Sequence, residues 1–130
     1  MSNQSNQFYE KYINTPDHAF EYDTQDIQDN KVWAALAYLG ILFFLPLIIN
    51  GGRSKYGRFH ANQGFILLLT GIVLGIAGNI LSWIPLVGGL LQALLSLAIL
   101  ALIVLGIYNS VTGKVKTLPF VGQLLNVFDK

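Results

Sequence analysis

Two long, uncharged and mostly apolar stretches alternate with short charged segments along this chain. The longer stretch, residues 59–113, runs for 55 residues without an Asp, Glu, Lys or Arg, and the shorter one covers residues 32–52. As a single α-helix the longer stretch would measure about 80 Å, against about 30 Å for the hydrocarbon core of a bilayer. It must therefore fold back on itself, and the pattern predicts an all-α integral membrane protein.

The apolar stretches predict three transmembrane helices, at about residues 32–49, 61–83 and 87–108. A tight hairpin between the second and third helices is predicted at Pro85, because paired glycines follow it closely. Pro46 predicts a kink or an early end for the first helix. Three polar residues just before that helix are expected to cap it: Asp26, Asp29 and Asn30.

The second and third predicted helices differ in composition. Of the 18 residues from Leu90 to Ile107, 12 are Leu, Ile or Val, which favours insertion of the third helix by roughly 4–7 kcal/mol. The second helix carries five small residues along one face: Gly64, Gly71, Gly75, Gly78 and Ser82. We interpret this stripe as a packing face within the chain, because small residues let helix backbones approach closely in lipid. Contact between two copies, or the general abundance of Gly in membrane helices, are the alternatives.

The two ends of the chain are expected to differ in structure. Residues 1–29 form a polar, acidic tail that we predict to be largely disordered, and residues 30–130 are expected to form a single helical membrane domain. Near the C-terminus, apolar residues recur at helical spacing over about residues 118–128. They predict an interfacial amphipathic helix, which Lys114 and Lys116 would anchor on anionic lipid. Docking of this helix onto the protein's own helices is the alternative.

Composition excludes several classes of function. Hydrophobic residues make up 53% of the chain and charged residues 12%, with a net charge of +1, so nothing favours nucleic-acid binding. There is no cysteine, and His18 and His60 are too far apart in the sequence to suggest a metal site. No predicted span contains a charged residue, which argues against an ion-coupled carrier. We therefore expect no enzyme activity, no cofactor and no bound metal.

The distribution of basic residues predicts the topology. Three spans would place the loop at residues 50–60 and the C-terminus on one face, and this face would hold six of the eight basic residues. The positive-inside rule then predicts a membrane protein with this face in the cytoplasm. The N-terminus would lie outside.

One dense polar cluster touches a predicted span, where the basic loop enters the second helix. We interpret it as the candidate functional or lipid-headgroup site: Arg58, Phe59, His60, Asn62 and Gln63. One hypothesis is a hydrogen-bonded knot in which His60 and Gln63 meet Tyr108 and Asn109 of the third helix. The other is that the cluster caps a helix while Arg58 binds a lipid phosphate.

Two amides, Asn79 and Gln92, lie within the apolar stretch on either side of the predicted hairpin. Folding back would place them at similar depth, where an amide pair contributes about 0.6–2 kcal/mol in lipid. We interpret them as a structural contact in preference to part of a transport pathway.

Several short motifs together resemble a known family. They are Asp26-Ile27 with Asn30-Lys31, residues 36–41, Pro46-Leu47, residues 58–64, and Gly113-Lys114 with Leu118-Pro119 and Gly122. The pattern resembles small bacterial membrane proteins related to the 20-kilodalton component of the chloroplast inner-envelope import translocon, here called Tic-like proteins. The most specific part is the string from Phe59 to Gln63. This resemblance implies a helical membrane protein with an accessory role in protein translocation, and it brings no catalytic residue.

Two classes of function remain. The first is a Tic-like translocation accessory or membrane scaffold, as the resemblance implies. The second is a holin-like or bacteriocin-like pore former, which the small size, the Gly-rich helix and the basic C-terminal segment allow. The expected partners are membrane lipids with anionic headgroups, and either other membrane proteins or further copies of this chain.

Overall fold

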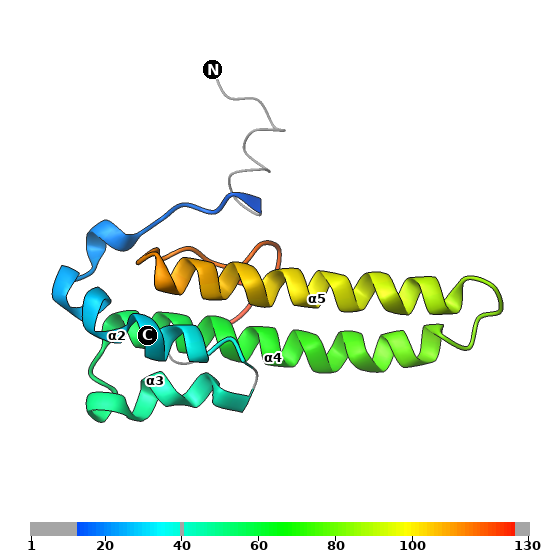
Figure 1. The fold of residues 1–130 in the computed structure, drawn as a ribbon, viewed down its shortest axis with the longest axis horizontal. Helices are drawn as coiled ribbons and strands as arrows, with labels where there is room; N and C mark the ends of the chain where they lie inside the picture. The colour runs from blue at the N-terminus through cyan, green and yellow to red at the C-terminus, as the bar shows by residue number, and fades with distance from the viewer. Residues whose placement is uncertain (1–12, 40, 127–130) are drawn as a thin grey trace, which may run out of the picture.

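Two long antiparallel helices dominate the fold (Figure 1). The computed structural model describes residues 13–39 and 41–126. The regular structure of these residues is all helical, without strands, and contains four α-helices: α2 (Thr24–Leu36), α3 (Leu45–Ile48), α4 (Lys55–Leu81) and α5 (Gly88–Val111). There are also three short 3₁₀ segments: η2 (Ala19–Glu21) before α2, η3 (Ile41–Phe44) between α2 and α3, and η4 (Ile49–Gly52) between α3 and α4.

The hairpin between α4 and α5 confirms the predicted reversal at Pro85. α4 has 27 residues and α5 has 24, so they are about 40 Å and 36 Å long. α4 begins six residues earlier than expected, because the Ser54 side chain accepts a hydrogen bond from the Gly57 amide and caps it at 2.8 Å. Within the turn, Leu86 has a φ of 74°, a left-handed conformation that is uncommon for a side chain of this size.

The prediction of a transmembrane helix at residues 32–49 is not confirmed. α2 ends at Leu36, and three successive i→i−3 hydrogen bonds then turn the chain through residues 37–39. At this turn a Cβ on Gly64 would lie 2.1 Å from the Ala37 carbonyl oxygen, so the turn lies directly on α4. Pro46 does not kink a long helix but lies in the first turn of α3. Contacts with distant residues, which hydropathy does not report, end the helix.

The residues expected to cap the first span have other positions. Asp23 caps α2, and its carboxylate accepts a hydrogen bond from the Gln25 amide at 3.2 Å. Asp26 lies inside α2 and accepts hydrogen bonds from the Tyr56 amide, at 2.9 Å, and from the Ser54 hydroxyl. Its negative charge therefore lies at the N-terminus of α4, where it favours the helix dipole.

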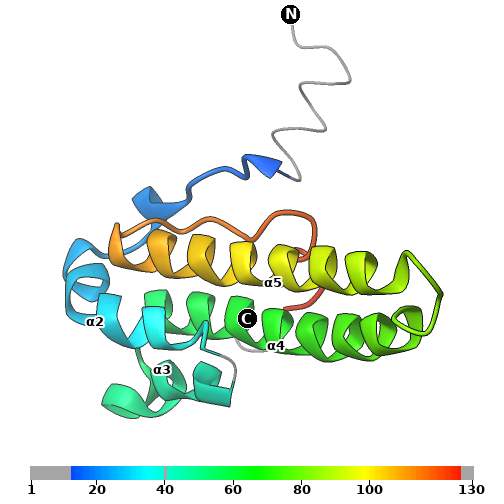
Figure 2. The ribbon, with the colours of Figure 1, turned by 45° about the vertical axis from the view of Figure 1, so that its right-hand side comes forward.

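The predicted amphipathic helix at residues 118–128 is not formed over the described part of that range. Residues 118–126 form turns and irregular chain, and Phe120 has a φ of 66°. Residues 127 and 128 lie outside the described residues. The chain after α5 folds back along the hairpin (Figures 1 and 2), and its backbone bonds to side chains of α4 in place of an internal helical ladder.

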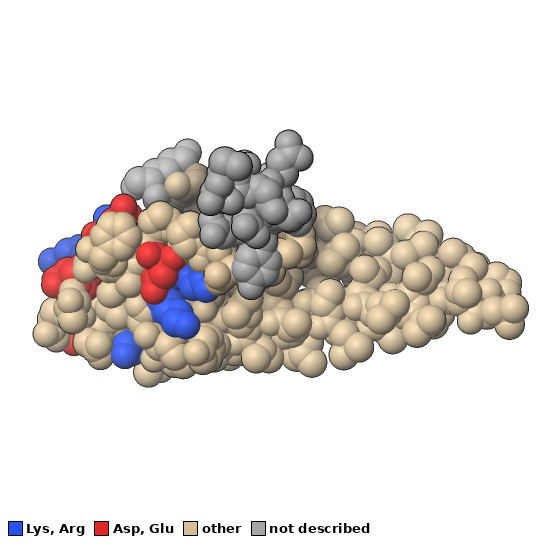
Figure 3. All heavy atoms as spheres, turned by 90° about the horizontal axis from the view of Figure 1, so that it is seen from above, with Lys and Arg blue, Asp and Glu red and all other residues tan. Residues whose placement is uncertain are grey.

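α4 and α5 are each long and apolar enough to cross a membrane. Their most apolar windows are only 22% and 6% buried, so they are not core helices of a compact domain. Large apolar side chains are exposed along both helices and at the turn, where Trp83 is 87% exposed. Over the described residues, the charged side chains seen in Figure 3 gather at one end and the tapering remainder shows none.

The N-terminal segment lies at this same charged end. The His18 amide donates to the Val115 carbonyl at 2.9 Å, and Asp26 contacts the start of α4. Residues 13–31 thus lie beside the loop before α4 and the chain after α5, whereas three spans would have placed them at the opposite end. α2 and α3 also lie beside the first half of α4 in both views (Figures 1 and 2).

Candidate functional site

His60 lies at the centre of a buried polar network at the charged end of the hairpin. Its side chain is fully buried on the second turn of α4. Nε2 lies 2.9 Å from the Lys114 carbonyl oxygen, which can only accept, so we infer that Nε2 carries the proton. Nδ1 then accepts from the Tyr38 hydroxyl at 2.6 Å. The Ser110 hydroxyl, 3.3 Å from Nδ1, donates instead to the Gly106 carbonyl at 2.9 Å. Both ring nitrogens of the neutral imidazole therefore have a hydrogen-bond partner.

Two buried tyrosines join this imidazole to the surrounding elements. Tyr38 follows α2, and its ring centroid lies 5.5 Å from that of His60. Tyr56 on α4 stacks edge-on against the same ring at 4.6 Å, and its hydroxyl donates to the Ser110 carbonyl at 2.6 Å. Burial raises the pKa of the Tyr38 hydroxyl well above its ordinary value, so it keeps its proton and remains a donor. The network thereby links α2, α4 and α5.

Gly106 allows the close approach of Tyr38 to α5. A Cβ at this position would lie 2.2 Å from the Tyr38 ring, so any larger residue would displace the ring. Neither residue was identified from the sequence as part of the site. The available signal was the spacing of Gly106 and Ser110, which places two small residues on one face of the helix.

The amides that follow His60 on α4 bind the C-terminal segment. Gln63 is 1% exposed, and its carbonyl accepts from the Leu118 amide at 2.9 Å while its NH₂ donates to the Gly122 carbonyl at 2.9 Å. Asn62 donates to the Leu125 carbonyl at 3.0 Å. These three contacts replace the backbone hydrogen bonds of the helix that was expected for this segment.

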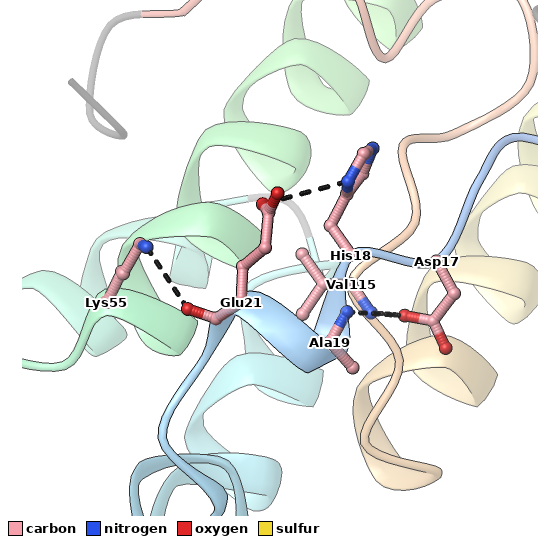
Figure 4. A network of polar contacts seen from close by, with 6 residues as sticks. All are labelled: Asp17, His18, Ala19, Glu21, Lys55 and Val115. Carbon is pink, nitrogen blue, oxygen red and sulfur yellow. Dashed lines mark hydrogen bonds and ion pairs between the residues drawn. The ribbon is translucent and has the colours of Figure 1, made fainter.

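The N-terminal segment is bound to the same C-terminal chain. Asp17 accepts hydrogen bonds from the amides of Val115, at 2.8 Å, and Ala19, at 2.9 Å. Figure 4 shows this contact, together with the approach of the Lys55 ammonium to the Glu21 carbonyl at 3.5 Å. Two segments about 100 residues apart in the sequence therefore meet beside the start of α4.

The structure places the five residues of the predicted cluster in different environments. His60, Asn62 and Gln63 are buried and bond to the protein itself, and Phe59 is 7% exposed in an apolar cluster with Ile27. Arg58 is half-buried, and its Nε has no hydrogen-bond partner among the described residues. A role of this cluster in binding lipid headgroups stays a prediction.

The predicted packing stripe of α4 meets different surroundings along its length. Gly64 lies against the turn after α2, and Gly78 lies against Gln92 of α5. A Cβ on Gly71 or Gly75 would meet nothing within 4 Å, and Ser82, at the end of the helix, donates to the Asn79 carbonyl at 2.7 Å. The stripe therefore contacts the chain at Gly64 and Gly78 and leaves open space between them.

Asn79 and Gln92 lie opposite each other near the hairpin turn. The Gln92 NH₂ donates to the Asn79 side-chain carbonyl at 3.4 Å, a long and therefore weak hydrogen bond. This pair provides the interhelical polar contact far from the charged end.

A shallow groove at the charged end carries both signs of charge. Its volume is about 430 Å³, and the charged residues that line it are Asp23, Asp26, Asp29, Arg53 and Lys55. Within the described ranges no three His, Cys, Asp or Glu side chains come together as a group that could hold a metal ion. The chemistry of the site is thus that of hydrogen bonding and electrostatic contact.

Comparison with known proteins decides the family. The model of the magnetosome magnetite crystal formation protein family matches residues 29–125. The chain belongs to this family. The magnetosome protein MamF of Paramagnetospirillum magneticum is 35% identical over 92 residues, covering 71% of this chain and 78% of the relative. MmsF of the same organism is 29% identical over 90 residues (69% and 79%), and MamF of Magnetospirillum gryphiswaldense is 30% identical over 92 residues (71% and 78%). No solved structure matches the chain.

The family corrects the resemblance drawn from short motifs. Membership of the magnetosome magnetite crystal formation family replaces the Tic-like assignment, and with it the expected role in protein transport. The matched region takes in both long helices, the His60 network and the C-terminal segment as far as Leu125. The string from Phe59 to Gln63 encodes buried contacts of this fold, and five residues were too few to separate two families of membrane proteins.

Proposed function

We propose that this protein is a non-catalytic membrane protein that takes part in magnetite crystal formation, anchored by the hairpin of α4 and α5. The observation that carries the proposal is the family match over residues 29–125, which includes the whole hairpin and the polar network at its base. The relatives are named as magnetosome proteins, and the two exposed apolar helices are suited to a membrane.

The buried polar groups support a structural role over a catalytic one. The side chains of His60, Gln63 and Asn62 bond to backbone groups of the chain after α5. Groups engaged in this way hold α4 and the chain after α5 together and are not directed at a reacting molecule. The network gives the charged end a defined shape, which a scaffold on a membrane surface requires.

The distribution of charge supports an orientation for the hairpin. The basic residues that the structure describes all lie at the charged end of the hairpin: Lys31, Arg53, Lys55, Arg58, Lys114 and Lys116. By the positive-inside rule this end faces the cytoplasm. Residues 13–31 and 112–126 then share that side, and the turn at residues 82–87 lies on the other.

Single cysteines in this cysteine-free chain test the anchoring. We place them at Gln28, Thr112 and Ser82, which are all exposed, and treat intact cells with an impermeant thiol reagent. We expect Gln28→Cys and Thr112→Cys to react only after the cells are opened, and Ser82→Cys to react from outside. Different behaviour of the first two variants would contradict the hairpin. The pore-forming alternative predicts leakage of small dyes from vesicles that contain the pure protein.

Expression in a magnetotactic strain that lacks MamF and MmsF tests the role in crystal formation. We expect the chain to shift the size or number of magnetite crystals toward those of the parent strain, as measured by electron microscopy. The variant Gln63→Leu, in which the charged end is destabilised, tests whether the effect on crystals requires a folded charged end. The amounts of both proteins in the membrane fraction are compared, so that a difference in crystals does not reflect a difference in protein level. Unchanged crystals at normal protein levels would contradict this role.

A further inference from the structure

The molecule is much wider at the charged end than at the hairpin turn, as the space-filling view shows (Figure 3). The buried residues of α4 lie between Tyr56 and Leu67, and beyond these only Gly78 is buried. In the first half, α2, α3 and the C-terminal segment flank the hairpin. Among the described residues, the part of the hairpin beyond Leu74 consists of α4 and α5 alone. The cross-section therefore shrinks along the hairpin axis.

Two of the flanking segments are as apolar as the hairpin itself. Residues 41–48 and 118–125, here called the wedge segments, contain no charged residue. Five of their large side chains are exposed in the absence of a membrane: Phe44 41%, Ile48 60%, Phe120 56%, Leu124 67% and Leu125 44%. Such a surface is costly in water, and it continues directly into the lipid-facing surface of α4.

The depth of the wedge segments follows from helix geometry. A hydrocarbon core of about 30 Å corresponds to about 20 helical residues, which counted back from Leu81 reach Asn62. The Phe43 ring lies 5.1 Å from that of Phe65, within this depth. The C-terminal segment forms an apolar groove of about 420 Å³ with α4, lined by Ile66, Leu69, Thr70, Val73, Leu74, Val121, Leu124 and Leu125. Phe43 thus lies beside the half of the span nearer the charged end, and the groove of the C-terminal segment extends from Ile66 to Leu74, just past the middle of the span.

We propose that the wedge segments insert mainly into one leaflet, the one on the charged side, and that the protein therefore binds preferentially to strongly curved bilayers. Extra volume in one leaflet is accommodated best where that leaflet is stretched, which is on the convex side. The partner of this surface is the acyl region of a convex lipid leaflet. The inference rests on the hairpin anchoring proposed above and goes beyond it, because a plain hairpin has no preference for curvature.

Membrane tubes pulled from giant vesicles test this proposal with the full chain. The protein is reconstituted in both orientations and labelled with a dye at Gln28→Cys, and an impermeant quencher then separates molecules by the side on which the charged end lies. We expect molecules with the charged end outside to be denser in the tube than in the parent vesicle, increasingly so as the tube narrows. Molecules of opposite orientation should be depleted. Equal density in tube and vesicle for both orientations would overturn the proposal.

A variant and a matched control sharpen the test. Leu124→Asp places a charged side chain on a wedge segment, and this side chain is too short to reach water from within the leaflet. The segment should therefore leave the leaflet, and the enrichment in the tube should fall. Phe20→Asp makes the same kind of change in η2, at a site that is 81% exposed among charged residues, and should sort like the parent. Equal enrichment of the parent and both variants in the tube would overturn the proposed insertion of the wedge segments.

Failure of the anchoring itself has a different signature. If the hairpin does not span the bilayer, alkaline carbonate removes the protein from vesicles, and this result overturns both proposals. Stable insertion without a preference for tubes overturns the wedge alone and leaves the hairpin anchor in place.

Discussion

The first and second halves of α4 differ in their content of polar residues and in their surroundings. The half nearer Lys55 carries the buried His60 and Gln63 and is covered by α2, the chain after α5 and the segment around α3. The half nearer Leu81 is largely exposed, apart from its contact with α5 and the groove that it shares with the C-terminal segment as far as Leu74. In lipid, apolar side chains need no protein partner, whereas polar groups do. Tertiary contacts therefore gather where the polar residues are.

This contrast predicts that one substitution type should have different effects in the two halves. An unpaired buried polar group costs about 1–3 kcal/mol, whereas an interhelical contact in lipid contributes about 0.6 kcal/mol on average. Each of the following variants is therefore paired with a control in the less constrained region. Stability is measured as the free energy of unfolding in mixed dodecyl maltoside and SDS micelles, followed by circular dichroism.

The largest difference is expected between Gln63→Leu and Gln92→Leu. Gln63→Leu leaves the Leu118 amide and the Gly122 carbonyl without partners in a buried site, and should lower the free energy of unfolding by about 2–5 kcal/mol. Gln92→Leu removes only the 3.4 Å contact with Asn79, and should cost about 0.6 kcal/mol or less. Similar losses for the two variants would contradict the comparison.

Substitution of glycine by alanine compares the two halves of α4 directly. At Gly64 the new Cβ would lie 2.1 Å from the Ala37 carbonyl oxygen, which belongs to the backbone and cannot rotate away. We expect Gly64→Ala to cost about 2–3 kcal/mol through forced separation of the two elements. At Gly71 nothing lies within 4 Å, so Gly71→Ala should be neutral or stabilise the helix by up to about 1 kcal/mol. A loss at Gly71 that depends on protein concentration would instead indicate contact between copies.

The same comparison extends to α5. Gly106→Ala would bring a Cβ within 2.2 Å of the Tyr38 ring, and should cost about 1–3 kcal/mol while shifting the near-ultraviolet circular dichroism of the tyrosines. Gly89→Ala, at a site with no atom within 4 Å, should leave both the stability and the spectrum unchanged. An unchanged tyrosine signal in Gly106→Ala would show that the ring does not lie on this glycine.

The smallest effect is expected for two aspartates of α2. Asp26→Asn weakens the charge-assisted bonds to the Tyr56 amide and the Ser54 hydroxyl at the start of α4, and should cost about 1–2 kcal/mol. Asp29→Asn affects an exposed contact with Gln25 at 2.7 Å, and should cost less than about 0.5 kcal/mol. A larger loss at Asp29 than at Asp26 would exclude Asp26 as a cap of α4.

The candidate site was predictable only in its position along the chain. The polar residues from Arg58 to Gln63 can be found in the sequence because they interrupt the apolar pattern. Their hydrogen-bond partners cannot be found in this way. The acceptors of His60 and Gln63 are largely backbone carbonyls, at Lys114 and Gly122, and a carbonyl leaves no trace in residue type. Tyr38 lies in a stretch that hydropathy assigned to a lipid-facing helix, although its ring is fully buried.

Local sequence determined the hairpin, because an uncharged run of 55 residues is far longer than one helix across a bilayer, and Pro85 with the glycines after it provides the turn. Tertiary contacts decided the structure of two segments at the charged end. Residues 32–49 are apolar enough for a span, yet Ala37 and Tyr38 pack against Gly64 and Gly106 and end the helix at Leu36. The chain after Leu118 has helical spacing, yet the amides of α4 take its backbone hydrogen bonds. In both segments the deciding partner lies far away in the sequence, where no local pattern can reveal it.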